Sequence, residues 1–481
     1  MQPDASAEPR RPEGPNPTES PAIELQGTST NPLPADETGS RDRERMRRPS
    51  EYSVPDDWVN LDELAATAPV ENVDEQHIYR HRSLEETRTR ESQRRKSIAA
   101  RRPEGEARPP QAEERAAEVS PFATQLFTLS YLIFFAILGT LARVGLSALT
   151  WYPGAPVSFS VLWSNFGGSF VMGFLIEARN LFFREEDAEP GSNEQLDGQV
   201  RSKRSDEEND PGPDLAEAKE KRMAVKKTLP LYVGLSTGFC GSFTSFSAFI
   251  ADAFSAVSND LVAPDGSDPP RGRNGGYSFM ALLAVVIVTV SLSLAGLSLG
   301  AHLAIALEHW KVSIRYPVTR TVLDPLGVIL GWGSWLGAVL MAVFPAHDAW
   351  RGRVVFALVF APLGCIARFY LSLHLNGKMA SFPLGTFVAN VTGTAVLGMA
   401  FDIAHVPIGG VVGCQVLQGV DDGFCGCLTT VSTWVAELNS LRRRHAYVYG
   451  GVSVVSAFAL MVAIMGGLRW SDGFSGLLCS T

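Results

Sequence analysis

The chain is predicted to be an all-α membrane protein, built from two inverted four-helix repeats joined by a linker transmembrane helix and preceded by a disordered N-terminal tail. Three observations predict this fold. Apolar segments of about 20 residues, the length that spans a bilayer, dominate the chain from residue 126 onward. The same polar residues recur in the same order in two parts of this region. One additional apolar segment separates the two parts.

The first 120 residues differ in composition from the rest. They are rich in Pro, Arg, Glu and Ser and poor in aromatic residues. Such a segment buries too little apolar surface to offset the entropy lost on ordering, so residues 1–120 are expected to form a disordered cytoplasmic tail. Because its first residues are polar, we expect no cleavable signal peptide. Two basic clusters ending at Ser50 and Ser97 resemble kinase sites, and binding to anionic lipid is an equal alternative.

The apolar part contains nine candidate spanning helices. In chain order they cover 126–150, 157–182, 229–256, 278–305, 325–345, 353–375, 384–405, 408–437 and 447–468. The first four are assigned to a domain over 121–310 with an inserted polar loop, 184–228. The linker helix lies within 311–350, and the last four form a second domain over 351–475. The third and eighth helices each carry Gly residues followed by a Thr/Ser cluster, so each is expected to be broken in mid-membrane, where surrounding protein must satisfy the backbone.

The polar residues of the two domains match at constant offsets. Arg143 and Arg368 are 225 positions apart, as are Asn165 and Asn390. A Gly-Phe-Cys-Gly motif opens the polar part of the third and eighth helices at an offset of 185, which is smaller because the polar loop lengthens the first domain. The body is therefore an internal repeat, whose members we call the first copy and the second copy.

The single linker helix determines the orientation of the copies. Four helices return the chain to its starting side, and one more crossing makes the second copy start on the opposite side. The loops assigned to the inside carry more Lys and Arg than those opposite, so the N-terminus is predicted to be cytoplasmic and the C-terminus outside. Inverted repeats place a binding path near the midplane, at the repeat interface.

The matched Arg and Asn residues indicate an anion site. An ionisable side chain within the membrane is costly and marks an ion path or a paired site. Arg143 and Arg368 are permanent cations, and the amides of Asn165 and Asn390 offer two donors each. The alternative for each Arg is a place near a helix end, from which the side chain reaches the interface.

Hydroxyl and aromatic side chains follow in the third and eighth helices. The hydroxyls can donate along a track, or they can bond back to carbonyls four residues earlier. Phe246 and Phe249 share one helix face, where packing is the usual role, although ring edges carry partial positive charge and can flank an anion. The hydroxyl residues are Thr244, Ser245, Ser247, Thr429, Thr430 and Ser432.

Acidic and Cys residues give weaker signals. Asp252 matches Glu437, and Glu177 matches Asp402. An interfacial position is the simpler interpretation for all four, while the first pair could line a pore mouth. The six Cys have no metal-ligand spacing, and most are expected to be small buried residues.

The repeated motifs resemble those of the fluoride channel family (CrcB/Fluc). They read Gly-x-x-Ala-Arg, then Asn-x-x-Gly-Ser/Thr, then Gly-Phe-Cys-Gly-x-x-Thr-Thr/Ser-x-Ser. The fused two-copy form with a linker helix is similar to the eukaryotic fluoride export proteins, and the resemblance covers about residues 125–470. In this family, single-copy members form antiparallel dimers with two narrow pores.

The resemblance implies roles for particular residues. Asn165 and Asn390 would contact fluoride, Phe246 and Phe249 would form an aromatic box, and Arg143 and Arg368 would line an aqueous vestibule. Tyr449 and Ser453 would be fourth-helix pore residues of the second copy. A structural Na⁺ would be held by backbone carbonyls, which map to Gly241, Thr244, Gly426 and Thr429.

The second copy departs from the family pattern at the aromatic positions. It has Val431 and Trp434 where the first copy has Phe246 and Phe249. A family pore takes one aromatic from each copy, so one pore would combine Phe246 with Trp434 and the other Val431 with Phe249. We predict unequal pores, of which one is a candidate for inactivity.

The resemblance and the residues together predict a fluoride-selective channel, not an enzyme. It would export fluoride passively across the plasma membrane and confer fluoride resistance, functioning as a monomer in the lipid bilayer with no nucleic-acid partner. The alternative is an inverted-repeat secondary transporter, a proton-coupled exporter of small molecules or anions. A purely structural membrane protein would leave the repeated polar residues unexplained.

Overall fold

The fold was analysed in a computed structural model of the 481-residue chain. The described residues are 58, 120–153, 155–157, 159–178, 181, 226–261, 273–307, 314, 318–345, 351–406, 410–477 and 479. All of them belong to one compact unit, Ser50–Thr481, and the second unit, Met1–Pro49, lies outside them. The predicted tail, apart from Trp58 and Ser120, and the polar loop up to residue 225 also lie outside the described residues.

The described elements of the first copy are all helical. Helix α3 is followed by α4, then by a segment made of α7, the π-helical turn η5 and α8, and then by α9 and α10. Their bounds are α3 Pro121–Thr150, α4 Leu162–Glu177, α7 Pro230–Val233, η5 Gly234–Cys240, α8 Gly241–Phe243, α9 Phe246–Ser258 and α10 Gly275–Ala306.

The linker comes next, and the second copy then follows the order of the first. The linker consists of η7 (Thr319–Leu323) and α12 (Asp324–Val343). The second copy comprises η8 Arg351–Val355, α14 Phe356–Leu375, η9 Asn376–Lys378, α15 Leu384–Ala404, α16 Gly410–Gly419, η10 Val420–Cys425, α17 Gly426–Leu428, α18 Ser432–Ser440 and α19 Arg443–Ser471. The described ranges contain no β-strand.

Length and composition identify membrane helices in the described part of the chain. Seven helical segments are long and apolar enough to cross a bilayer: 121–150, 230–258, 275–306, 319–343, 356–378, 384–404 and 443–471. The predicted all-α membrane class is thereby confirmed. Helix α4 has only 16 residues, and the α16–α18 segment is interrupted, so nine spanning helices and the inversion of the copies remain predictions.

Both predicted helix breaks are present, at matching positions. Helix α8 ends before Thr244, whose ψ is 151°, and α9 begins at Phe246. Helix α17 ends before Thr429, whose ψ is 154°, and α18 begins at Ser432. A π-helical turn precedes each short helix. Each break frees backbone groups in the protein interior, and these groups need partners.

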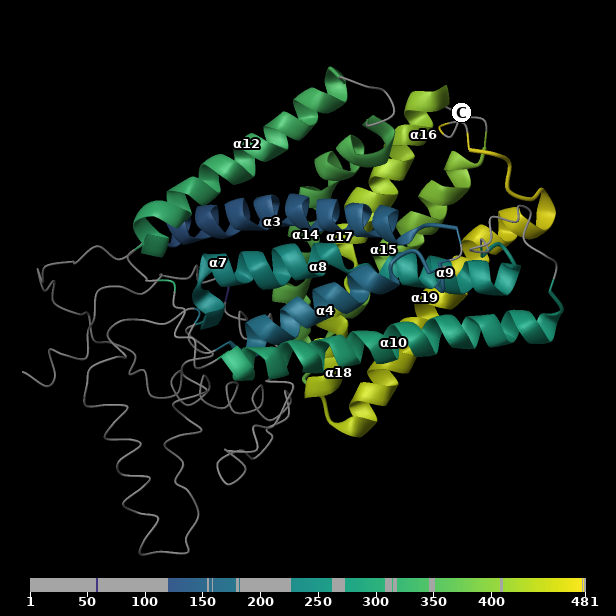
Figure 1. Ribbon diagram of the computed structural model, residues 1–481, viewed down its shortest axis with the longest axis horizontal. Coiled ribbons are helices and arrows are strands. Elements are labelled where there is room, and N and C mark those ends of the chain that lie inside the picture. Colours follow the sequence, from purple (N-terminus) through teal and green to yellow (C-terminus); the bar gives the residue numbers. More distant parts are fainter. Residues whose placement is uncertain are drawn as a thin grey trace, which may run out of the picture. The chain divides into compact units, whose positions relative to one another are not determined.

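Glycine permits the close packing of α4 on α10, which lie side by side (Figure 1). A Cβ atom added at Gly173 would collide with the carbonyl oxygen of Leu297, and one added at Gly300 with that of Phe170. Small residues at such crossings let two helices approach closely within a membrane. This packing places α4, which carries Asn165, against the interior of the bundle.

The linker helix α12 packs beside α3 (Figure 1). At the start of α12, the Tyr131 hydroxyl donates to the Asp324 carboxylate at 3.1 Å. Further along, the Trp332 indole donates to the Ser130 hydroxyl at 3.1 Å. The linker is therefore held to the first copy by polar contacts as well as by apolar packing.

The cysteines divide into two groups. Cys240, Cys365, Cys425 and Cys427 are free and buried, which agrees with the expectation for most of them. Cys414 of α16 and Cys479 form a disulfide with a Cα–Cα distance of 5.6 Å. Cysteine spacing did not predict this bond, because 65 residues separate the two positions.

Candidate functional site

The two helix breaks exchange hydrogen bonds. The hydroxyl oxygen of Thr429 accepts from the backbone N–H groups of Phe246 at 3.2 Å and Ser247 at 3.1 Å. The hydroxyl of Thr244 accepts in the same way from the matching residues of the second copy, Val431 and Ser432, both at 3.2 Å. Each copy thus satisfies two of the backbone N–H groups that the break in the other copy releases.

The two threonine hydroxyls are also used as donors. Thr244 donates to the Cys240 carbonyl at 3.1 Å, and Thr429 donates to the Cys425 carbonyl at 2.9 Å. A hydroxyl has one proton and two acceptor lone pairs, so these bonds use its full capacity. The alternative considered for the hydroxyl residues, a bond to the carbonyl four residues earlier, is therefore present at Thr244 and Thr429. The same two hydroxyls also join the breaks.

Each asparagine binds a backbone residue of the break in its own copy. Asn165 Oδ1 accepts from the Ser245 N–H at 2.9 Å, and Asn165 Nδ2 donates to the Ser245 carbonyl at 3.4 Å. Asn390 makes the matching bonds to Thr430 at 2.8 and 3.2 Å. Both asparagines are fully buried. The side-chain nitrogen of Asn carries two hydrogens, and the bonds above use one of them. The second N–H of each Asn side chain is therefore not used in these bonds.

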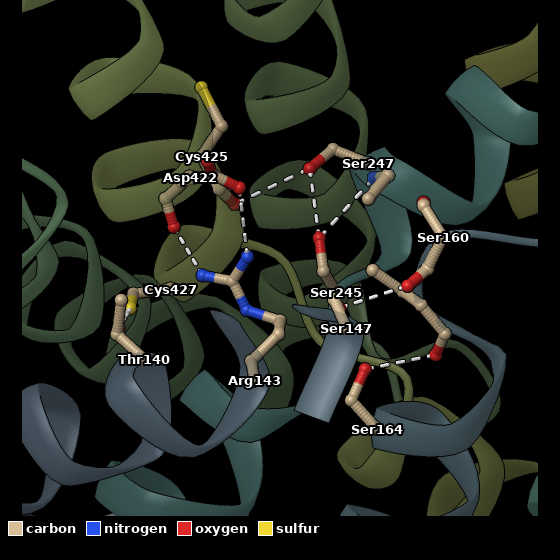
Figure 2. A network of polar contacts seen from close by, with 12 residues as sticks. Thr140, Arg143, Ser147, Ser160, Ser164, Ser245, Ser247, Asp422, Cys425 and Cys427 are labelled. Atoms are coloured by element: carbon tan, nitrogen blue, oxygen red, sulfur yellow. Dashed lines mark hydrogen bonds and ion pairs between the residues drawn. The ribbon is translucent and has the colours of Figure 1, made fainter. Parts of the chain in front are cut away.

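The other hydroxyls form a buried polar track. The hydroxyl of Ser245 lies 3.3 Å from that of Ser247, and the hydroxyl of Thr430 lies 3.3 Å from that of Ser432. All four are completely buried. Figure 2 shows the Ser245 and Ser247 side chains turned toward each other. The six predicted hydroxyl residues are therefore brought together at the two breaks.

Arg143 is buried and binds the broken segment of the second copy. Its guanidinium donates to the carbonyl oxygens of Ser242, at 3.2 Å, and Asp422, and it pairs with the Asp422 carboxylate at 3.4 Å (Figure 2). The Arg143 side chain is 3% exposed and that of Asp422 is 52% exposed. The buried guanidinium of Arg143 is thus paired with a carboxylate, that of Asp422, which is about half exposed.

Arg368 makes the reciprocal contact, but no acidic side chain among the described residues pairs with it. It donates to the Thr237 carbonyl at 2.6 Å, and Thr237 is the residue that matches Asp422. Its Nε and Nη1 have no hydrogen-bond partner within the described residues. Both arginines are 2% exposed, so neither guanidinium extends to the surface.

Glycines make room for both guanidinium groups. A Cβ atom added at Gly241 would collide with the Arg368 guanidinium, and one added at Gly426 with the Arg143 guanidinium. The glycines are therefore needed because each cation packs directly on the backbone of the opposite copy.

A cavity of about 500 Å³ opens beside Arg143, and Asp252, Asp421 and Asp422 also line it. Asp252 accepts hydrogen bonds from the backbone N–H and the hydroxyl of Ser160, at 3.1 and 3.0 Å. Three carboxylates and one guanidinium therefore line this cavity, and Asp422 is the carboxylate paired with the guanidinium.

The residue that matches Asp252 has a different environment. Glu437 is buried and accepts from the Thr386 hydroxyl and the Tyr449 hydroxyl, both at 2.7 Å. Of the two acidic residues considered for a pore mouth, only Asp252 lines this cavity. Ser453, the other predicted fourth-helix residue, donates to the Tyr449 carbonyl at 2.7 Å.

Three aromatic rings meet next to the breaks. Phe246 makes edge-to-face contacts with Phe249, at 5.6 Å between ring centroids, and with Trp434, at 5.3 Å. All three rings and Val431 are at most 1% exposed and share one apolar cluster. The structure thus brings together Phe246 and Trp434, the two rings expected to come from different copies.

The breaks also release backbone carbonyls in the first copy. In an unbroken helix, the carbonyls of Gly241 and Thr244 would accept from the N–H groups of Ser245 and Ala248. Here those N–H groups bond to Asn165 Oδ1 and to the Ser245 hydroxyl.

The second copy releases its carbonyls in the same way. The N–H groups of Thr430 and Thr433 bond to Asn390 Oδ1 and to the Thr430 hydroxyl, which leaves the carbonyls of Gly426 and Thr429 without their helical donors. Oxygen ligands suit a hard cation such as Na⁺. The described residues contain no group of three His, Cys, Asp or Glu able to hold a metal. The carbonyls of Gly241, Thr244, Gly426 and Thr429 are the groups that the sequence assigns to Na⁺.

Sequence reasoning missed the carboxylate beside Arg143. The signal was available, because aligning the copies at the offset of 185 places Asp421 and Asp422 opposite Ser236 and Thr237.

These features define a helical membrane protein with a buried polar site of amide, hydroxyl and guanidinium donors, assembled by two copies of one motif. A family model described as "CrcB-like protein, Camphor Resistance (CrcB)" matches residues 130–301 and 355–467. The chain belongs to this family, and the two matched segments correspond to the two copies.

Several named proteins are similar to this chain. Fluoride export protein 1 of Neurospora crassa is 53% identical over 95% of this chain and 90% of the relative. Fluoride export protein 1 of Candida albicans is 34% identical over 70% of this chain and 79% of the relative. The fluoride-specific ion channel FluC of Pseudomonas aeruginosa is 33% identical over 26% of this chain and 98% of the relative. No solved structure matches the chain.

The bonds between the breaks are testable through stability. Thr429→Val removes the hydroxyl that accepts from two buried N–H groups, and an unsatisfied buried donor costs about 1–3 kcal/mol. We expect a clear fall in the melting temperature of the purified protein in detergent. The control is Thr433→Val, because this partly buried hydroxyl contacts only the Thr430 hydroxyl among the described residues. Equal melting temperatures for the two variants would contradict the role assigned to Thr429.

Proposed function

We propose that this chain is a fluoride-selective channel that exports fluoride passively across the plasma membrane and confers fluoride resistance. The observation that carries the proposal is the 53% identity, over nearly the whole chain, to a protein named fluoride export protein 1. Similarity to a protein named fluoride-specific ion channel favours a channel over the proton-coupled exporter.

The polar site has the chemistry that a dehydrated anion requires. An ion that sheds water in a narrow passage loses hydrogen bonds, and fixed donors must replace them. The remaining N–H groups of Asn165 and Asn390 and the hydroxyl track supply such donors. The edges of the rings at Phe246 and Trp434 add partial positive charge. Because each asparagine amide is already fixed to the break of its own copy by two hydrogen bonds, it needs little reorganisation when an anion arrives.

The proposed architecture has nine spanning helices, inverted copies, a cytoplasmic N-terminus and an external C-terminus. The disulfide supports this orientation. In this topology Cys414 and Cys479 both lie on the outer side, and disulfides persist in oxidising environments outside the cytosol. Since both broken helices come from one chain, the site is complete in a monomer.

The membrane potential supplies the driving force. An inside-negative potential expels an anion with about 2.3 kcal/mol per unit charge per 100 mV. A passive pathway needs no further energy source.

A Na⁺ ion held by the carbonyls of Gly241, Thr244, Gly426 and Thr429 would add positive charge between the two breaks. The residues of this chain prepare the position, because Asn165, Ser245, Asn390 and Thr430 engage the N–H groups that would otherwise cover these carbonyls.

The two proposed pores are unequal. One pairs Phe246 with Trp434, which are in ring contact. The other pairs Phe249 with Val431, which has no ring. Arg143 and Arg368 occupy the vestibules at opposite ends in the proposed orientation, and only Arg143 has a carboxylate partner among the described residues.

Flux measurements test the proposed function. The full chain in liposomes should release fluoride when potassium and valinomycin clamp the potential, with chloride release at least about 100-fold slower and no requirement for a pH gradient. Protein-free liposomes are the control. Fluoride release that depends on a pH gradient would instead identify a proton-coupled exporter.

The inequality of the pores predicts different effects for two matched substitutions. Phe246→Ile removes a ring from the pair with Trp434, whereas Phe249→Ile affects the pore with a single ring. A ring contact contributes about 0.5–1.5 kcal/mol, so we expect Phe246→Ile to slow fluoride flux by up to about tenfold and Phe249→Ile to slow it much less. Similar losses in both variants would show that the pores are equivalent.

The proposed orientation predicts access to the disulfide from outside. A membrane-impermeant phosphine added to intact cells should reduce the bond between Cys414 and Cys479, and an impermeant maleimide should then label both residues. The double variant Cys414→Ser/Cys479→Ser is the control, and it should remain unlabelled because the other four cysteines are buried. Labelling that requires permeabilised cells would place the C-terminus inside.

A further inference from the structure

Trp434 has a buried hydrogen-bond donor that has no partner among the residues that the structure describes. Its side chain is 1% exposed, and its Nε1 meets no acceptor within the described residues. By contrast, the partly buried Trp335 of the linker helix donates to the Val359 carbonyl at 2.9 Å. An indole N–H can only donate, and a buried polar group without a partner calls for a specific explanation.

The neighbours of Trp434 place it at the proposed site. Its ring meets that of Phe246 edge to face at 5.3 Å and 70°. It lies two residues after Ser432, whose N–H bonds to Thr244 across the breaks. A Cβ atom on Gly450 would lie 3.8 Å from Cζ2 of Trp434. Since Cζ2 is next to the ring carbon that carries Nε1, the N–H edge of the indole lies on the side of α19.

The surroundings would strengthen a bond from this N–H to an anion. Trp434 belongs to an apolar cluster that includes Phe246, Phe249, Val431 and Tyr449. In such surroundings few dipoles screen a charge, so a hydrogen bond to an anion is stronger than in water. An unused donor there is costly without the anion and favourable with it.

The first copy has no such donor. The residue that matches Trp434 at the offset of 185 is Phe249, which offers only a ring edge. The difference between the copies is therefore more than a change of ring size. It introduces one N–H group on one side of the pseudo-symmetric site.

We propose that the Trp434 indole N–H is a fluoride ligand, and that it makes the pathway between Phe246 and Trp434 the tighter fluoride site of the two. This inference rests on the proposed function and adds a donor to it. Fluoride accepts hydrogen bonds more strongly than the larger halides, so a single directional N–H favours it over chloride. The ring edge of Phe246 completes the contact from the other copy.

The test is Trp434→Phe, which keeps an aromatic ring and removes the N–H. Without fluoride, the variant should be more stable than the wild type, with a melting temperature higher by roughly 1–3 °C, because an unsatisfied buried donor is removed. With fluoride, the wild type should gain more stability than the variant. The fluoride concentration that gives half-maximal flux should rise about tenfold, as expected for the loss of one bond to a charged ligand.

Trp335→Phe is the matched control, because it deletes an indole N–H that has a protein acceptor. It should lower the melting temperature and leave the half-maximal fluoride concentration unchanged. A purely structural role for Trp434 predicts the same pattern in Trp434→Phe, namely lower stability and unchanged fluoride dependence, and that result would overturn the inference.

The outcomes separate the inference from the proposed function. If the wild type passes no fluoride and fluoride does not change its melting temperature, the proposed function fails and this inference fails with it. If the wild type passes fluoride and Trp434→Phe has the same half-maximal concentration and the same fluoride-dependent stabilisation, this inference alone fails. Should Trp434→Phe not yield folded protein, the claim that its N–H is unsatisfied without the anion is wrong, and the inference is overturned.

Discussion

The exchange of hydrogen bonds between the two helix breaks is the constraint on which the structure depends. A broken helix within a membrane exposes N–H and carbonyl groups that lipid cannot satisfy. Thr244 and Thr429 each supply a hydroxyl that accepts two of these N–H groups from the opposite copy. Neither broken helix is complete alone, because two N–H groups at each break are bonded only when the other copy is in place. The polar site is thus a product of the interface between the copies.

The arginines extend the same principle. Each guanidinium donates to a carbonyl of the broken segment that belongs to the other copy, Arg143 to Asp422 and Arg368 to Thr237. A buried cation is tolerated when neighbouring groups bond to it, and a glycine at 241 or 426 lets it approach the backbone. The Gly-Phe-Cys-Gly motif and the distant Arg are therefore two parts of one contact. Their joint recurrence in the sequence has this physical cause.

The sequence predicted the helices and the breaks because their signals are local. Apolar length marks a spanning segment, and Gly followed by Thr and Ser marks a break, as found at Thr244 and Thr429. The bonding partners could not be predicted, because a hydroxyl or amide can bond to many groups and only the fold selects one. The link from Asn165 to Ser245 and the disulfide from Cys414 to Cys479 join positions that are distant in the sequence. Family resemblance placed residues at the site but did not show that the two threonine hydroxyls are already fully bonded.

Fusion of the two copies explains why the site departs from symmetry. In an assembly of identical single-copy chains, every substitution appears at both ends of the pseudo-twofold axis. A carboxylate beside one arginine would then also appear beside the other, and a tryptophan would replace a phenylalanine in both pathways. In this chain the two members of a matched pair can differ. Thr237 of the first copy matches Asp422 of the second, and Phe249 matches Trp434. The residues that join the breaks remain matched, since each is needed by the other copy, whereas charge and ring identity can differ. The scaffold therefore constrains the threonines and glycines at both ends, and leaves the residues proposed to contact fluoride free to differ between the copies.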